Sequence, residues 1–174
     1  LEEALVYLRH AQILNSNDVS QYILEGAIHA KMGNSEEANE AYKKALSIDP
    51  ENPEAYYLIG KAIFEKRMYD SSIVYFDDAN KHFENKIARI EKIIFQNVPE
   101  PTKELKQEII KLWSEKKHDE LDQLIRVKLG FDGGITAQQR NIETYFKATD
   151  GMAQSYYWLG MAHYKLNKDN VALT

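Results

Sequence analysis

The chain has 174 residues, of which 44% are hydrophobic, and its net charge is −5. The absence of cysteine excludes disulfides and thiolate metal sites. It does not fix the compartment: the cytoplasm is preferred, and a processed or exported parent stays open as an alternative because the first residue is Leu1 rather than Met. No apolar run approaches the roughly 18 residues of a membrane span. Residues 1–80 hold 7 basic and 14 acidic side chains, which argues against nucleic acid as a partner because phosphate contacts need a basic face.

Residues 19–86 contain one helix pattern twice, at a spacing of 34 residues. The matched positions are Tyr22 and Tyr56, Gly26 and Gly60, Ala38 and Ser72, Tyr42 and Phe76, and Ala45 and Ala79. Small residues let two helices approach closely, and large aromatic residues fill the space beside them. The pattern therefore predicts two antiparallel helix pairs, over residues 19–52 and 53–86.

These residues resemble the tetratricopeptide repeat (TPR), a family with a period of 34 residues. Its pattern has aromatic residues at positions four and twenty-four, Gly at eight, Ala at twenty and twenty-seven, and Pro at thirty-two. Residues 19–52 fill these positions with Tyr22, Gly26, Ala38, Tyr42, Ala45 and Pro50. The resemblance implies an all-α fold, a right-handed superhelix (α-solenoid) of antiparallel helix pairs that binds other proteins.

Both ends of the chain fit parts of the same repeat. Residues 1–17 fit a second half, with Ala4, Leu8 and Ala11 at positions twenty, twenty-four and twenty-seven. Residues 153–174 fit a first half, and Tyr156 and Gly160 follow Tyr56 and Gly60 at a spacing of 100 residues. We interpret residues 1–174 as a single repeat domain of about five repeats that begins and ends within a repeat.

The middle of the chain, residues 87–152, is predicted to hold two degenerate repeats. Three periods amount to 102 residues, so the spacing of 100 accommodates two further repeats with a net deletion of two. Helices are expected at 87–97, 102–116, 118–129 and 136–149. In an alternative frame, 102–116 pairs with 118–130 as one repeat and 136–149 is an extra helix. The first frame is preferred because it keeps first and second helices alternating.

The resemblance also indicates where a partner would bind. In this family the first helix of each pair builds the inner wall of the superhelix, and positions five, nine and twelve face it. Here these positions hold Ile23, Ala27, Ala30, Tyr57, Lys61, Phe64, Tyr157, Met161 and Tyr164. Because most of them are apolar or aromatic, we expect a concave groove for a peptide or helical segment of a protein partner. The alternative is that they pack against neighbouring helices or a chain terminus.

Other functions have less support in the sequence. Family members that dock chaperone tails carry Lys and Asn at positions five and nine of their first helix, where this chain has Ile23 and Ala27, so a chaperone C-terminal tail is not the expected partner. No catalytic, cofactor or metal site is predicted, and His29 and His163, separated by four repeats, are too distant to share an ion. A second hypothesis is a regulatory module that senses a peptide and controls an effector domain outside this chain.

Overall fold

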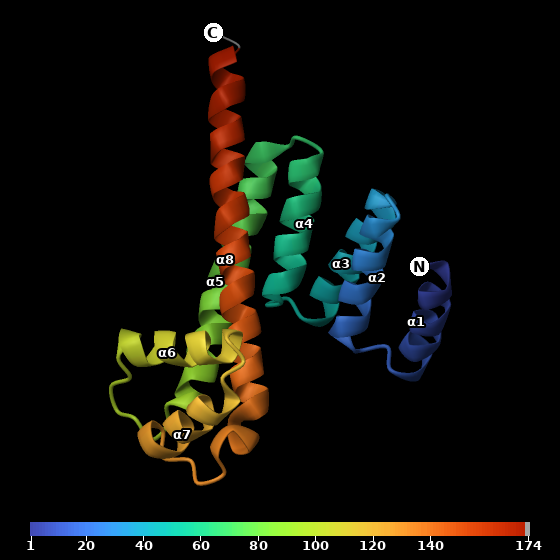
Figure 1. Cartoon of the computed structure of the whole chain (residues 1–174). Helices are drawn as coiled ribbons and strands as arrows, with labels where there is room; N and C mark the ends of the chain where they lie inside the picture. The colour runs from blue at the N-terminus through green and yellow to red at the C-terminus, as the bar shows by residue number, and fades with distance from the viewer. Residues whose placement is uncertain (173–174) are drawn as a thin grey trace. The chain divides into compact units, whose positions relative to one another are not determined.

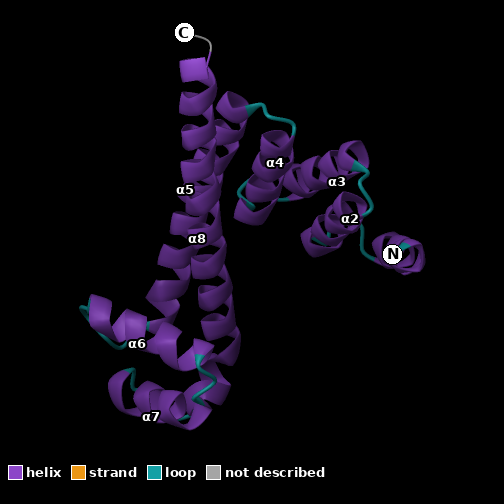
Figure 2. Ribbon diagram, turned by 45° about the horizontal axis from the view of Figure 1, so that its top comes forward, coloured by secondary structure: helices purple, strands orange, loops and turns teal. Residues whose placement is uncertain are grey.

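The computed structural model describes residues 1–172 and, except at residues 137, 168 and 170–172, their side chains. All regular structure in this part is α-helical (Figures 1 and 2), which confirms the predicted class. The helices are α1 (Glu2–Leu14), α2 (Val19–Lys31), α3 (Ser35–Ile48), α4 (Pro53–Glu65), α5 (Tyr69–Ile94), α6 (Lys103–Ser114), α7 (His118–Lys128) and α8 (Gly134–Ala172). The superhelix and the number of repeats stay predictions. The last two residues of the predicted partial repeat 153–174 lie outside the described residues.

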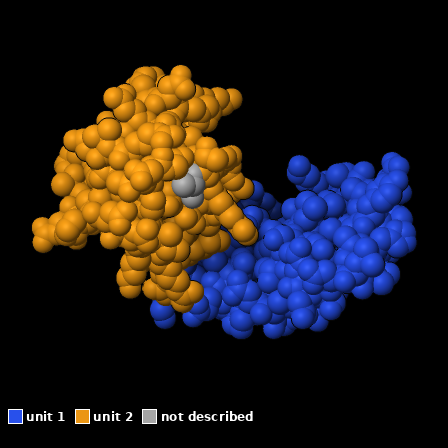
Figure 3. All heavy atoms as spheres, turned by 90° about the horizontal axis from the view of Figure 1, so that it is seen from below, with its two compact units in different colours: residues 1–82, 152–174 blue, residues 83–151 orange. Residues whose placement is uncertain are grey.

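The chain divides into two compact units, coloured separately in Figure 3. Unit 1 comprises residues 1–82 and 152–174, and unit 2 comprises residues 83–151. Unit 2 therefore interrupts unit 1 in the sequence, and both crossings fall inside helices, one in α5 and one in α8. The 100-residue spacing between Tyr56 and Tyr156 spans the whole of unit 2.

In unit 1, the contact between paired helices depends on glycine facing an aromatic ring. A Cβ atom added to Gly26 of α2 would collide with the ring of Tyr42 on α3, and one added to Gly60 of α4 would lie 2.9 Å from Cε1 of Phe76 on α5. Tyr42 is 2% exposed and Phe76 is 0% exposed. Burial, with smaller effects of Glu54 and Glu65, raises the pKa of Tyr42 to about 12. The ring therefore stays neutral while it fills the space that the glycine leaves.

The two pairs also share a turn. The first helix of each pair is followed by a residue in the left-handed region, Gly33 at φ 82° and Arg67 at φ 61°. The next residue then donates its backbone N–H to a carbonyl five residues earlier, from Asn34 to His29 at 2.9 Å and from Met68 to Ile63 at 3.3 Å, which satisfies carbonyls that the helix end would leave unpaired. Residues 19–52 and 53–86 thus begin as the two helix pairs that the sequence predicts, α2 with α3 and α4 with α5.

The two flanking segments pack against these pairs within unit 1. Leu5 and Leu8 of α1 form a small buried cluster with Ile28 of α2. Near the other end, the hydroxyl of Ser155 on α8 donates to the backbone carbonyl of Phe76 at 3.4 Å. α8 therefore lies against α5 at Ser155, although unit 2 separates the two residues in the sequence.

The helix ends that we predicted near residues 86 and 149 are wrong. α5 continues from Tyr69 to Ile94, and α8 continues from Gly134 to Ala172. No proline interrupts either segment. Gly151 lies within α8, where an ideal Cβ would lie 2.7 Å from Cζ of Phe83 on α5, so the two helices approach closely there. Helix-to-helix packing, which residue pattern alone does not reveal, keeps both helices continuous.

The turn between α6 and α7 matches the alternative frame of the sequence analysis. Thr102 caps α6 by accepting from the Leu105 backbone N–H at 3.2 Å. At the other end Lys116 takes φ 57°, and the Lys117 N–H donates to the Leu112 carbonyl at 2.9 Å. This is the turn found in both pairs of unit 1, and α6 contacts α7. Segments 102–116 and 118–130 therefore form one helix pair, while 136–149 is the first part of α8 and no separate helix.

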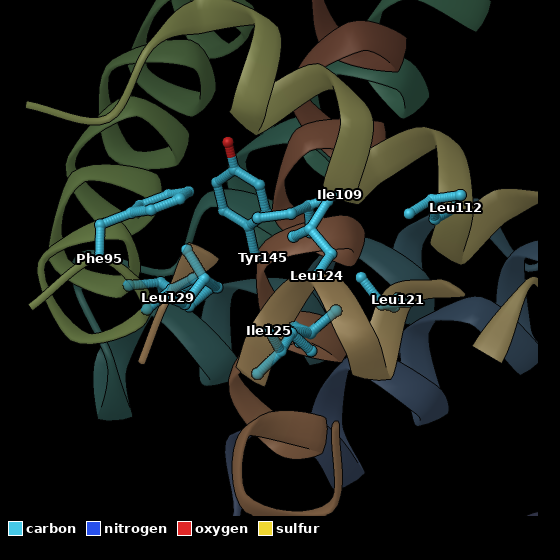
Figure 4. Close-up of a cluster of buried hydrophobic side chains, with 11 residues drawn as sticks. Phe95, Ile109, Leu112, Leu121, Leu124, Ile125, Leu129 and Tyr145 are labelled. Atoms are coloured by element: carbon cyan, nitrogen blue, oxygen red, sulfur yellow. The ribbon is translucent and has the colours of Figure 1, made fainter. Parts of the chain in front are cut away.

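Unit 2 has its own core, drawn in Figure 4, to which α5, α6, α7 and α8 all contribute. Its buried members are Ile90, Ile94, Phe95, Ile109, Leu112, Leu121, Leu124, Ile125, Leu129, Ile142 and Tyr145. Beside it, the Glu91 carboxylate accepts from the Tyr145 hydroxyl at 3.0 Å and from Lys106 Nζ at 2.6 Å. Burial, followed by the Glu91 charge, raises the pKa of Tyr145. One acidic side chain of α5 thus binds α6 and α8.

We predict that substitution by alanine destabilises the fold at Gly26 and Gly60 and stabilises it at Gly160. Gly26→Ala and Gly60→Ala should each lower the free energy of unfolding by about 1–3 kcal/mol, because the added methyl overpacks an aromatic ring. Gly160→Ala should raise it by up to about 1 kcal/mol, because nothing lies within 4 Å of that position and alanine favours the helix. Urea denaturation followed by circular dichroism measures all three. Equal effects would show that the assigned contacts are wrong.

A second prediction concerns the core of unit 2. Ile125 is fully buried and Val127, two residues later, is 71% exposed. Ile125→Ala should lower the free energy of unfolding of unit 2 by about 2–5 kcal/mol, whereas Val127→Ala should change it by less than about 0.5 kcal/mol. Fluorescence of Trp113, in a Trp158→Phe background, reports on unit 2 during urea denaturation. A Val127 effect as large as that of Ile125 would contradict the assigned core.

Candidate partner-binding surface

Of the predicted wall residues, those on α4 are contacted by α8. Tyr57 is 9% exposed, its ring centroid lies 6.3 Å from that of Phe76, and its hydroxyl donates to Gln154 Oε1 at 3.2 Å. The Phe64 ring centroid lies 5.1 Å from that of Trp158 in an edge-on contact. α4 therefore uses much of its predicted wall to hold α8, which is the packing alternative that the sequence analysis left open.

Trp158 of α8 contacts several of the predicted wall residues, although it was not itself predicted as a site residue. Its ring meets Phe64 and Tyr157 edge-on, with centroids 5.1 and 5.8 Å apart, and Lys61 Nζ lies 5.3 Å from its centroid. Trp158 stands one residue after the wall position of Tyr157, so the family positions did not select it. A large aromatic residue directly beside a wall position was the available signal. We call Lys61, Phe64, Tyr157 and Trp158 the Trp158 cluster.

The predicted wall residues on α8 are the most exposed of the set. Tyr157 is 61% exposed and Tyr164 is 58% exposed, while Met161 between them is half-buried. Residues seven apart lie on the same side of a helix, two turns from each other. α8 consequently presents two tyrosine rings in a row, the first of them anchored against Trp158.

The three wall residues on α2 belong to another part of unit 1. Ile23 is half-buried and packs against a cluster containing Tyr42 and Ile59. Ala27 is half-buried and Ala30 is exposed. These side chains are small or already engaged, so they supply a smooth apolar surface and no large anchor. Of the nine predicted residues, the structure gathers Lys61, Phe64 and Tyr157 into one cluster.

The chemistry available here is that of recognition by apolar and aromatic contacts. Among the side chains that the structure describes, no group of His, Asp and Glu residues could hold a metal ion. None of the described helices, α8 with its 39 residues included, offers an apolar stretch that could cross a membrane. The Lys61 ammonium gives the Trp158 cluster one positive charge, held over the face of an indole ring, where a cation is attracted by the ring's negative face.

Comparison with known proteins agrees with this geometry. Residues 26–66 match the family described as TPR repeat. The match starts at Gly26 in α2, spans α3 and α4, and ends at Lys66, so it includes the end of the first helix of one pair, its second helix and the first helix of the next pair. No curated protein matches the chain. The resemblance found in the sequence is thereby confirmed for residues 26–66, and repeats of this kind provide extended surfaces for other proteins.

We predict that Trp158 stabilises unit 1. Trp158→Ala removes two aromatic pairs, each contributing about 0.5–1.5 kcal/mol, so the free energy of unfolding should fall by about 1–3 kcal/mol. Lys61→Met, which keeps most of the side-chain length and loses the cation, should cost at most about 1 kcal/mol. Thermal denaturation followed by circular dichroism compares both with Tyr7→Ala, which alters an exposed side chain of α1. Trp158→Ala and Tyr7→Ala variants that melt alike would refute this role.

Proposed function

We propose that this chain, which carries a TPR repeat over residues 26–66, is a non-catalytic scaffold that binds a short peptide or helical segment of a partner protein. The proposed binding surface is the predicted inner wall of α2, α4 and α8. The exposed tyrosines of α8 are the proposed anchors for the partner. Residues chiefly on α4 support these anchors.

The observation that supports this proposal best is the pair Tyr157 and Tyr164. Two tyrosines more than half exposed, on one side of a helix and seven residues apart, offer a large contact area with few rotatable bonds. Binding energy at protein interfaces is concentrated in a few such aromatic residues. An exposed ring that a neighbouring side chain holds in place loses less freedom on binding, and Trp158 contacts Tyr157 in this way.

The α4 residues have a supporting role in this proposal. Tyr57 and Phe64 position α8 through Gln154 and Trp158, so their removal would act on binding indirectly. Lys61 is the single charged residue among the nine wall positions. Since one charge is screened by salt and apolar contact supplies the remainder, raised ionic strength should weaken binding only slightly.

The test is a selection of short peptides from a displayed random library on the immobilised chain, followed by affinity measurement in solution. Selected peptides should bind with a dissociation constant on the order of micromolar. Tyr157→Ala and Tyr164→Ala should each weaken that binding about five- to thirty-fold, the loss of roughly 1–2 kcal/mol expected for one anchor. Tyr7→Ala is the matched control because it removes an equally exposed tyrosine, 68% accessible on α1.

Two outcomes count against the groove. Selected peptides that bind both tyrosine variants as tightly as the parent, and lose affinity when residues of α3 are changed, would place the working surface on the second helices. Selected peptides that respond to Tyr7→Ala as strongly as to Tyr157→Ala would show binding without a defined site. Circular dichroism of each variant verifies that the fold is retained.

A further inference from the structure

We propose that unit 2 carries a binding site of its own, a pocket that takes one large apolar side chain from an acidic segment of a partner protein. Residues of α6, of the α6–α7 turn, of the start of α7 and of α8 line this pocket: Trp113, Ser114, Lys116, His118 and Phe146. We call it the Trp113 pocket. Its lining belongs to unit 2, so the site is separate from the wall proposed on unit 1.

Aromatic rings form most of the lining, and the fold holds them in place. Trp113 is half-buried and packs against the core of unit 2. Its ring meets that of His118 edge-on, with centroids 5.9 Å apart and an angle of 80° between the planes. Phe146 is half-buried on α8, directly after Tyr145, which belongs to the core. Because rings that their neighbours already hold lose little freedom when a ligand arrives, this lining suits an apolar group.

The size of the pocket favours a single side chain. Its volume is about 340 Å³, at the lower end of the roughly 300–1,000 Å³ of small-molecule sites. The Ser114 hydroxyl already donates to the Lys111 carbonyl at 2.8 Å, so the lining supplies few polar partners. A large apolar side chain such as that of phenylalanine can enter, and the rest of the segment then lies across the mouth of the pocket.

Charge decides which segments fit. Aromatic rings can also attract a cation, since their faces are negative. The described lining, however, contains the cation Lys116 and no acidic residue. The neighbouring Lys117 is 3.2 Å from Glu115 and 3.8 Å from Glu120, whereas Lys116 forms no ion pair with any residue that the structure describes. The Lys116 charge therefore repels a cation and attracts a carboxylate beside the bound apolar side chain.

The backbone at Lys116 allows this charge to be removed without disturbing the turn. Lys116 takes φ 57°, in the left-handed region that glycine adopts most easily, and its backbone N–H donates to the Trp113 carbonyl at 3.1 Å. Arg67 occupies the same place in the α4–α5 turn of unit 1, at φ 61°. Glycine at either position keeps the backbone conformation and deletes one cation, so the two substitutions form a matched pair.

Titration of the ¹⁵N-labelled full chain with capped five-residue peptides tests the proposal. The probe is acetyl-Ser-Glu-Phe-Glu-Ser-amide, and the reporter is the indole N–H signal of Trp113, identified as the one that remains in the Trp158→Phe variant. We expect this signal to move with a dissociation constant on the order of 1 mM. Gln in place of both Glu residues of the peptide should weaken binding about two- to five-fold. Lys in their place should weaken it further, and Ala in place of Phe should abolish it.

Variants of the chain separate the charge from the aromatic lining. Lys116→Gly should lower the affinity for the Glu peptide to that for the Gln peptide, because it removes the charge alone. His118→Ala should weaken the binding of both peptides about two- to ten-fold through the loss of one ring. Arg67→Gly is the matched control and should leave binding unchanged. Trp113 stays in place because it packs against the core.

Several results would overturn the proposal. One is a Trp113 signal that does not move at peptide concentrations up to about 10 mM, well above the expected dissociation constant. Others are a Lys peptide that binds as tightly as the Glu peptide, and an Arg67→Gly variant that responds as Lys116→Gly does. Loss of binding in Tyr157→Ala would place the peptide on the wall of unit 1 instead. A Trp113 signal that moves with protein concentration alone would assign the pocket to a second copy of this chain.

Discussion

Close approach of two helices at a glycine, with an aromatic ring filling the space that the glycine leaves, is the constraint on which unit 1 depends. Gly26 with Tyr42 and Gly60 with Phe76 are the two instances. A side chain at either glycine would separate the helix axes and leave the ring without a site. The left-handed residues Gly33 and Arg67 then turn the chain so that the second helix returns along the first. Contact and turn together explain why the pattern recurs every 34 residues.

A glycine facing an aromatic ring also occurs in unit 2, where Gly151 of α8 faces Phe83 of α5. α5 and α8 contact one another in antiparallel fashion: in unit 1 Phe76 meets Ser155, and in unit 2 Phe83 meets Gly151 and Glu91 meets Tyr145. In unit 1, Gln154, Ser155 and Trp158 of α8 contact α4 and α5. Residues 83–151, which interrupt unit 1 in the sequence, form unit 2 and have a separate core. An inserted unit with its own core can lengthen a chain without removing contacts from the repeats around it.

The binding surface that we propose lies on the same side of the first helices as contacts that hold the fold together. On α4 that side faces α8, so Tyr57 is buried and Phe64 meets Trp158. On α8 it remains open, and Tyr157 and Tyr164 are exposed. The same repeat position is therefore buried on α4, where α8 covers it, and exposed on α8 in this structure. That principle underlies our assignment of the anchors to α8 and of support to α4.

The sequence alone determined the helical class, the 34-residue period of α2 to α5, the TPR repeat and the small and aromatic residues of each helix contact, because these depend on local pattern and on short-range spacing. It predicted helix ends near residues 86 and 149 that do not exist, and the packing of α5 on α8, in which Phe83 meets Gly151, joins residues too far apart in sequence for local pattern to reveal. It also did not predict Trp158 as a site residue, and it assigned Tyr57 and Tyr157 the same binding role. Burial is a property of the neighbours that a side chain acquires on folding, and only the tertiary structure placed α8 against α4, covering Tyr57 and leaving Tyr157 exposed.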